Sequence, residues 1–186
     1  MVEPIDAGAR AELPSDVLVG PKARFHEVVA GHRFRVSARS FFQTRLDGAE
    51  ALVAAVRDAV AGADGDVVVD AEVVAIERTA AAYHDARRNL ADRKATFVHA
   101  DVARWRARPA DVVIADPARA GLGRAGVNAL GRALAPRFVL VSCDPVSLAR
   151  DAKLLDELGY HHERSVVIDL FPQTPHAEVV TRFDLR

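Results

Sequence analysis

The sequence predicts an α/β fold whose sheet is doubly wound, mostly parallel and closed by an antiparallel pair of strands. Short apolar runs alternate with segments of helical periodicity, which is the pattern of repeated strand and helix units. The 186 residues fit one such domain, and a composition of 50% hydrophobic and 27% charged residues is typical of globular proteins. The last two apolar runs, 165–170 and 178–185, predict the closing pair of strands.

The N-terminal part predicts an arm followed by a β-hairpin. Residues 1–24 contain scattered prolines and acids without periodicity, which indicates a loose arm. Phe25–Val29 and His32–Val36 flank a short Ala-Gly turn and predict two paired strands, within a hairpin region of residues 25–40. Arg33 and Arg35 share one face of the second strand, and that basic face suits either phosphate groups or water.

The remaining elements each have a signal of their own. Leu52, Val56 and Val60 form one apolar stripe, which predicts a helix over about 50–61. Gly159 suits the position just beyond a helix, so a helix over about 146–158 is expected to end there. The other expected elements are helices at about 78–93 and 125–134, and strands at 67–70, 96–98 and 112–114.

Composition excludes several classes of function. The net charge of −1 gives no overall electrostatic attraction to nucleic acid, so any such binding has to be local. No apolar stretch approaches the ~18 residues of a membrane helix, and no signal peptide is recognisable, which predicts a cytoplasmic protein without membrane contact. A single cysteine excludes an internal disulfide. His161-His162-Glu163 is interpreted as solvated surface, so no metal site is predicted.

Cys143 is the most informative residue of the chain. It lies in Ser142-Cys143-Asp144-Pro145, directly after the apolar run Phe138–Val141 and before a predicted helix. Open α/β sheets bind ligands where strands end in this way. A lone cysteine is more often an inert buried side chain, so the function of Cys143 depends on the motifs around it.

Five ordered motifs resemble those of the RNA uracil-5-methyltransferases, which use S-adenosylmethionine to methylate transfer and ribosomal RNA. The resemblance runs from about Val28 to the C-terminus and implies a Rossmann-like methyltransferase sheet, with residues 41–186 as the catalytic domain. The hairpin region would then be the remnant of a preceding region. The motifs are Ser40–Gln43, Val74–Glu77, Asp116–Gly121, Ser142–Pro145 with Leu148–Asp151, and Asp169–Glu178.

The resemblance also implies roles for individual residues. In that family the cysteine thiolate adds to C6 of uracil, which makes C5 nucleophilic enough to accept the methyl group, and Cys143 matches this nucleophile. Glu178 matches the glutamate that removes the C5 proton, and a partly desolvated carboxylate with a raised pKa would do this best. Gln43, Glu77 and Asp116 match positions that contact the cofactor. A uridine in folded RNA would have to be flipped into the site.

Each of these residues also has a simpler interpretation. Glu77 at the end of a strand can face water, although an acid at that point of a nucleotide-binding sheet commonly accepts a hydrogen bond from ribose. Asp116 before a proline can merely begin a turn. The role of Gln43 rests almost wholly on the resemblance.

Two features depart from the family pattern. The family carries a glycine-rich loop and a helix after its first strand, whereas here Asp70 is followed at once by Ala71–Glu77. Neighbouring parallel strands need a crossover of a dozen or more residues, so either 67–77 is one bent strand or a segment is missing. The RNA-binding barrel that usually precedes the catalytic domain is reduced here to the hairpin region, which puts RNA affinity in doubt.

Three functions therefore stay open. The first is methylation of uridine C5 in tRNA or 23S rRNA through a covalent Cys143 adduct. The second is a degenerate domain that keeps the fold and binds RNA or a protein without binding the cofactor. The third is a methyltransferase for another substrate, with a structural Cys143. The sequence leaves the RNA, the uridine and the oligomeric state undetermined.

Overall fold

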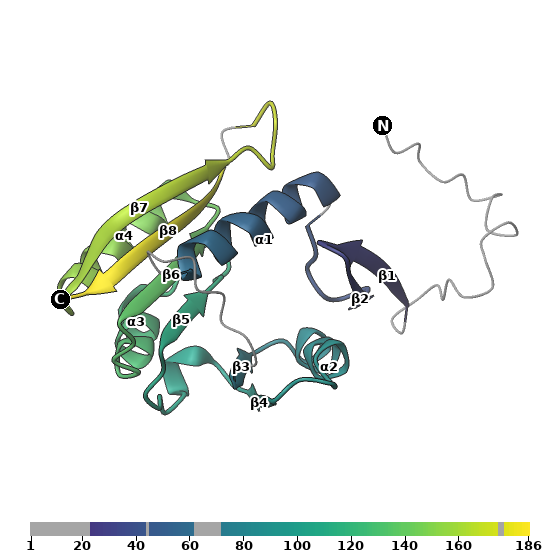
Figure 1. Cartoon of the computed structure of the whole chain (residues 1–186), viewed down its shortest axis with the longest axis horizontal. Coiled ribbons are helices and arrows are strands. Elements are labelled where there is room, and N and C mark those ends of the chain that lie inside the picture. The colour runs from purple at the N-terminus through teal and green to yellow at the C-terminus, as the bar shows by residue number, and fades with distance from the viewer. Residues whose placement is uncertain (1–22, 44, 62–71, 175–176) are drawn as a thin grey trace, which may run out of the picture.

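The structure is a computed structural model that describes residues 23–43, 45–61, 72–174 and 177–186 (Figure 1). Its helices and strands follow one another in the alternating order that the sequence predicts. The strands are β1 (Arg24–Val29), β2 (His32–Ser37), β3 (Val73–Glu77), β4 (Ala95–His99), β5 (Val112–Ala115), β6 (Arg137–Ser142), β7 (Tyr160–Ile168) and β8 (Glu178–Leu185). The helices are α1 (Leu46–Val60), α2 (Ala80–Asn89), α3 (Gly123–Gly131) and α4 (Pro145–Asp156), with a 3₁₀ turn at Val102–Arg104.

The described strands form three hydrogen-bonded sheets. Strands β5 and β6 run parallel and are continued by β8 and β7, which are antiparallel, in the order β5-β6-β8-β7; this is called the main sheet below. Strands β3 and β4 form a parallel pair, the small sheet, and β1 and β2 form an antiparallel hairpin. The α/β class, the parallel pairs and the antiparallel C-terminal pair are confirmed.

Helices cover both faces of the main sheet, and alternate residues of β6 point to each side. Phe138 and Leu140 pack with α3 and α4, in a core that also includes Phe183 and Tyr160. Val139 and Val141 pack with Val180 of β8 beneath α1. Figure 1 shows α1 lying across the strands on one side while α3 and α4 lie on the other. This burial on both faces explains why β6 reads as a continuous apolar run.

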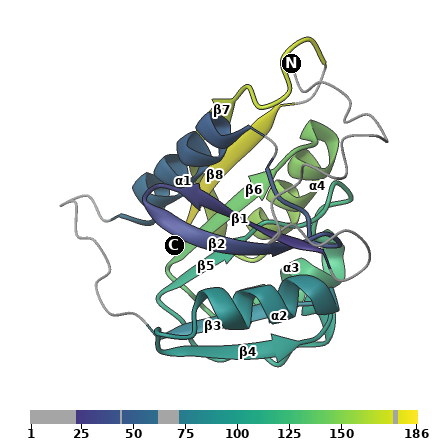
Figure 2. The ribbon, with the colours of Figure 1, turned by 90° about the vertical axis from the view of Figure 1, so that its right-hand side faces the viewer.

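The hairpin is attached to α2 by polar side chains. Asp85 of α2 accepts hydrogen bonds from the Ser37 backbone N–H (2.7 Å) and from the hydroxyls of Ser37 and Ser40. One turn later, the Asn89 carboxamide pairs with both the N–H and the C=O of Arg35. Side chains four apart on a helix lie on one face, so α2 satisfies the outer edge of β2. Figure 2 shows the hairpin lying beside α2.

The largest differences from the predicted element boundaries are at α1, α2 and β7. Helix α1 begins at Leu46 because Gly48, which reads as a breaker, is a helical residue whose Cα packs directly against the Leu170 side chain. Helix α2 ends at Asn89, whose side chain bonds to the hairpin. Strand β7 begins at Tyr160, because the exposed polar residues after it pair with β8 at the sheet edge.

Several sequence expectations lie outside the described residues. They are the arm up to residue 22, the strand at 67–70, the junction of Asp70 with Ala71, and the histidine two residues before Glu178. The division into an arm, a hairpin remnant and a catalytic domain stays a prediction. Among the described residues, no helix is long and apolar enough to cross a membrane.

Candidate active site

Three of the five predicted site residues lie at one edge of the main sheet. Asp116 directly follows β5, and Cys143 directly follows β6, its parallel neighbour. Glu178 is the first residue of β8, which runs antiparallel to β6 and pairs Val179 with Ser142. The start of β8 therefore lies beside the end of β6. The carboxyl ends of parallel strands are the edge at which open α/β sheets bind ligands.

Two carboxyl groups interact at this edge. Glu178 is buried, with 4% of its surface exposed, and desolvation together with the nearby charge of Asp116 raises the pKa of Glu178 to about 7. Desolvation raises the pKa of Asp116 to about 6, although Asp116 itself keeps contact with solvent. Two such carboxyls titrate as a coupled pair near neutral pH.

Cys143 lies half-buried at the N-terminus of α4. The next residue, Asp144, caps this helix: its carboxylate accepts the Ser147 backbone N–H at 2.7 Å, and Pro145 occupies the first turn. The pKa of Asp144 lies below its ordinary value, chiefly because of this hydrogen bond, and Arg119 adds to the effect. The Ser-Cys-Asp-Pro motif is therefore the cap of a twelve-residue helix, and Arg119 lies near it.

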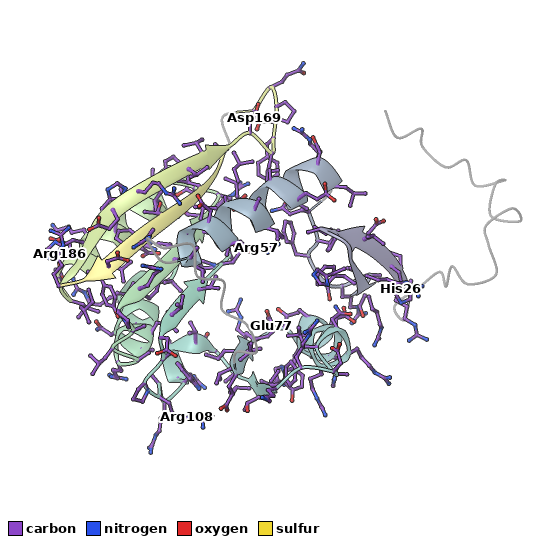
Figure 3. The ribbon with its side chains drawn as sticks, viewed as in Figure 1. His26, Arg57, Glu77, Arg108, Asp169 and Arg186 are labelled. Carbon is purple, nitrogen blue, oxygen red and sulfur yellow. The ribbon has the colours of Figure 1, made fainter. Side chains whose placement is uncertain are left out.

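Glu77 occupies the equivalent position on the small sheet, where β3 ends and the chain leads into α2 (Figure 3). Its side-chain oxygen Oε1 accepts the Thr79 backbone N–H. His99, the last residue of β4, is its partner across the parallel pair. Asp101 follows shortly after, and its Oδ1 accepts the Ala103 N–H at 2.9 Å. The sequence analysis missed Asp101, although an acid just beyond an apolar strand was a usable signal.

Gln43 lies half-buried in the segment between the hairpin and α1. The hydrogen bond from Ser40 to Asp85 ties the start of this segment to α2, at 2.8 Å. Among the described residues, no hydrogen bond or ion pair joins Gln43 to the other predicted site residues. The structure thus brings Asp116, Cys143 and Glu178 together on the main sheet, and it positions Gln43 and Glu77 on the parts of the fold next to α2.

Arg35 does not have either of the environments predicted for the basic face of the hairpin. Its Nε lies 3.5 Å from Asp85, an almost fully buried carboxylate on α2. Arg35 therefore forms a structural ion pair with Asp85 that holds the hairpin against α2. Arg33 on the same strand is exposed. The alternation that put both arginines on one face could not reveal that α2 covers part of that face.

The fold, together with the site at the carboxyl ends of β5 and β6, defines the class of protein: it is a Rossmann-like α/β protein of the methyltransferase type. A solved structure of M. jannaschii TYW2 in complex with AdoMet matches 91% of this chain and 90% of its own, with a TM-score of 0.57 and 16% identity. At that identity the likeness concerns the fold alone.

Sequence comparison then gives relatives of this chain. The chain is 35% identical to an uncharacterized RNA methyltransferase of Streptococcus mutans over 83% of the chain, and 34% identical to one of Lactiplantibacillus plantarum over 90%. It also matches the crystal structure of the Pyrococcus abyssi tRNA (uracil-54, C5)-methyltransferase in complex with S-adenosyl-L-homocysteine, with a TM-score of 0.72 and 28% identity over 86% of the chain. These similarities confirm the resemblance to the RNA methyltransferases that the five motifs carry.

The match covers only part of these relatives. The chain spans about two fifths of the length of the two bacterial proteins, at 40% and 42%, and 44% of the Pyrococcus abyssi chain. No protein-family profile matches the chain. The activity, substrates and partners of the whole relatives are therefore not transferred to it as established properties.

Proposed function

We propose that this chain carries the catalytic centre of an S-adenosylmethionine-dependent RNA methyltransferase that acts on C5 of uridine. The observation that carries the proposal is the buried Glu178 carboxyl, with a pKa of about 7, at the sheet edge where Cys143 lies. A general base works best when its pKa is near the working pH, and a thiolate is suited to reversible addition to an electron-poor carbon.

Cys143 and Glu178 together can carry out each bond change of methyl transfer to C5. The Cys143 thiolate adds to C6 of the uracil ring, and the electron pair of the C5–C6 double bond moves to C5 and its carbonyl. C5 then attacks a methyl carbon, which S-adenosylmethionine supplies on a sulfonium leaving group. Glu178 removes the proton from C5, the double bond forms again, and the C6–sulfur bond breaks to release the Cys143 thiolate.

The cofactor residues proposed are Gln43, Glu77 and Asp116. Glu77 fits such a group because, within the described part of the chain, it accepts a hydrogen bond only at Oε1, from the Thr79 N–H, so its second oxygen can accept a ribose hydroxyl. The exposed Asp116 lies one strand away from Cys143, between the small sheet and the nucleophile in chain order. In this arrangement Glu77 would orient the nucleoside end of the cofactor, and Asp116 would contact the end nearer to the reacting carbon.

The proposed substrate is a uridine in tRNA or 23S rRNA. Support comes from the names of the relatives: two are RNA methyltransferases, and the Pyrococcus abyssi protein is a tRNA (uracil-54, C5)-methyltransferase. Because Glu178 is buried at the sheet edge, a uridine stacked in a helix could not reach it. The target base would therefore be extruded from the RNA into the site.

A uridine with fluorine at C5 tests the proposal directly. Glu178 cannot remove fluorine as a proton, so the covalent adduct accumulates after methyl transfer. We expect the parent chain, with S-adenosylmethionine and 5-fluorouridine RNA, to give a denaturation-resistant protein–RNA band, and Cys143→Ala to give none. Methyl transfer that survives in Cys143→Ala would contradict the proposal and favour a methyltransferase with a different acceptor.

A second candidate follows from one sequence feature, the direct junction of Asp70 with Ala71 where the family has a glycine-rich loop. It is a degenerate domain that binds RNA or a protein and lacks cofactor binding. Calorimetric titration with S-adenosylmethionine separates the two candidates. Saturable binding that is lost in Glu77→Ala supports the enzyme, and no binding by the parent chain supports the degenerate domain.

A further inference from the structure

We propose that Asp151, assisted by Arg150, is a positioning residue that clamps the loop after Asp116 to the helix after Cys143. The clamp would fix the separation of the proposed nucleophile from the proposed carboxylate pair. The inference rests on the proposed function, because the two ends of the clamp matter only if Cys143 and Asp116 take part in one reaction, Cys143 at the uridine and Asp116 at the cofactor. Neither Asp151 nor Arg150 contacts the reacting atoms in this account.

The Asp151 carboxylate in the middle of α4 reaches the N-terminus of α3. It lies in α4, eight residues after Cys143, and is 1% exposed. Its Oδ2 accepts the Leu122 backbone N–H at 2.6 Å, and its Oδ1 accepts the Gly123 N–H at 3.0 Å. These are N–H groups at the start of α3, which have no partner within their own helix. One side chain of α4 therefore caps α3.

Arg150 adds a second connection between the same two segments. Its Nη2 donates to the Ala120 carbonyl at 2.8 Å, and both Nε and Nη2 donate to Asp151 Oδ1. The guanidinium thus neutralises the buried carboxylate while holding the loop. Arg119, at the tip of the same loop, acts electrostatically on Asp144, the residue next to Cys143. Ala120, Leu122 and Gly123 are thereby hydrogen-bonded to α4, and Arg119 acts on the residue that caps this helix.

The loop itself is shaped to receive this clamp. Gly121 has a φ of +71°, which side chains rarely adopt, and its N–H bonds to the Ala118 carbonyl at 2.7 Å in a tight turn. A Cβ at Gly121 would collide with Asp151 Oδ2 and lie 2.6 Å from Arg150 Nη2. The backbone of the loop and the Asp151 carboxylate are therefore in direct contact, with no room for adjustment.

If Asp151 and Arg150 served only to hold α3 and α4 together, a buried charged hydrogen-bond network would not be required. Helices α3 and α4 already share an apolar core through Val127, Leu130 and Leu155, and burying a charge is costly unless every partner is in place. A network of fixed hydrogen bonds does what an apolar contact cannot: it sets one register between the loop and the helix. The loop begins immediately after Asp116, and α4 begins two residues after Cys143, so this register sets the relative position of Asp116 and Cys143.

The test compares the rate of adduct formation with cofactor affinity in Asp151→Asn. Asparagine keeps the shape of the side chain but turns one acceptor into a donor that faces a backbone N–H. We expect the rate of adduct formation on 5-fluorouridine RNA to fall by about 100-fold, the order expected when reacting groups are misplaced by about 1 Å. Affinity for S-adenosylmethionine, measured by calorimetry, should fall far less, because Gln43 and Glu77 lie outside the clamp.

Two further variants separate positioning from folding. Gly121→Ala breaks the same contact from the loop side, so the double variant with Asp151→Asn should lose no more rate than the single variants. Asp184→Asn is the matched control, because Asp184 is a carboxylate paired with Arg137 and Arg182 at the opposite end of the main sheet. We expect it to lower the melting temperature and to leave the rate of adduct formation unchanged.

Each outcome decides a separate question. A parental rate in folded Asp151→Asn overturns the clamp and leaves the proposed function standing. A loss of rate that only follows the unfolded fraction measured by circular dichroism also overturns it. If the parent chain itself forms no adduct, the proposed function fails, and the clamp fails with it.

Discussion

The two parts of the fold are held together by different forces. The main sheet has a dense apolar core on both faces, and Phe138, Val139 and Leu155 are completely buried there. The small sheet and its helix α2 contain no completely buried apolar side chain among the described residues, and the buried residue of α2 is Asp85. The proposed chemistry lies on the apolar-cored part, whereas Glu77 lies on the part held by polar contacts.

This difference predicts which parts of the molecule tolerate amino-acid substitution. Burial of apolar area provides most of the free energy of folding, so the main sheet should carry most of the stability. Polar contacts provide less free energy but specify geometry, so the hairpin and α2 should respond locally to substitution. The largest effects should therefore come from the core of the main sheet.

Phe138→Ala should give the largest loss of stability. Phe138 is completely buried in the core beneath α3 and α4 and packs edge-on against Tyr160. Removing a buried phenylalanine leaves a cavity and costs about 3–5 kcal/mol. Ile76→Ala on the half-buried β3 is the matched comparison and should cost clearly less. Urea unfolding followed by circular dichroism measures both, and an equal loss would break the contrast between the two parts.

The pH dependence of stability should report Glu178. Its folded pKa of about 7 lies above the ordinary glutamate pKa of 4.5, so between these values the native state binds the proton and the unfolded state does not. Stability therefore falls as pH rises from about 4.5 to 7, by roughly 3 kcal/mol at most, and is level above that. Glu178→Gln should flatten this slope.

Chemical denaturation at several pH values between 4.5 and 8 measures that slope in both chains. Asp116 titrates in the same range, so a small residual slope is expected in Glu178→Gln. An identical slope in the parent and in Glu178→Gln would show that Glu178 is not a carboxyl with a raised pKa. The site proposed at the edge of the main sheet would then lose its principal support.

Asp85→Ala should loosen the hairpin without unfolding the main sheet. The change leaves the Ser37 N–H and two serine hydroxyls without their acceptor, and it removes the ion-pair partner of Arg35. The expected cost is about 1–3 kcal/mol. Amide hydrogen exchange should quicken in β1 and β2 and stay slow in β6. Uniformly faster exchange would mean that the hairpin and the main sheet unfold together.

Asp58→Ala should have the smallest effect. Asp58 of α1 pairs with Arg164 of β7, but both side chains are largely exposed. Exposed ion pairs contribute about 0.2–1 kcal/mol and are screened by salt. The midpoint of urea unfolding should move slightly at low salt and not at 0.5 M salt. A loss as large as that of Asp85→Ala would mean that surface charge stabilises the main sheet more than its core suggests.

The sequence predicted what local patterns encode. The strands at β1, β2, β5 and β8 were recognised because each is an apolar or alternating run bounded by turn residues, and Gly159 does take a positive φ of 89° beyond α4. The early start of α1 was missed because Gly48 reads as a helix breaker, whereas in the fold it is a helical residue whose missing side chain leaves room for Leu170, far along the chain. The polar start of β7 gave no strand signal, because an exposed edge strand needs no apolar face.

The proposed site, like the fold, could be predicted only where local sequence patterns encode it. Cys143, Glu178 and Asp116 could be proposed from motifs, and the topology places them at one edge. The electrostatic coupling of Glu178 with Asp116 and the clamp of Asp151 could not be read from the sequence, because each depends on residues that are distant in the chain. Arg35 was assigned to an open face because nothing local to β2 reveals that α2 covers it.

We propose that Cys143 and Glu178 together exchange the C5 proton of a uridine for a methyl group. Release of tritium from RNA that carries 5-tritiated uridine tests it most directly, because only reaction at C5 frees that label. We expect tritium release to depend on S-adenosylmethionine and to be abolished in Cys143→Ala. The number of tritium atoms released should equal the number of methyl groups transferred. Methyl incorporation without tritium release would contradict the claim and place the chemistry at another atom.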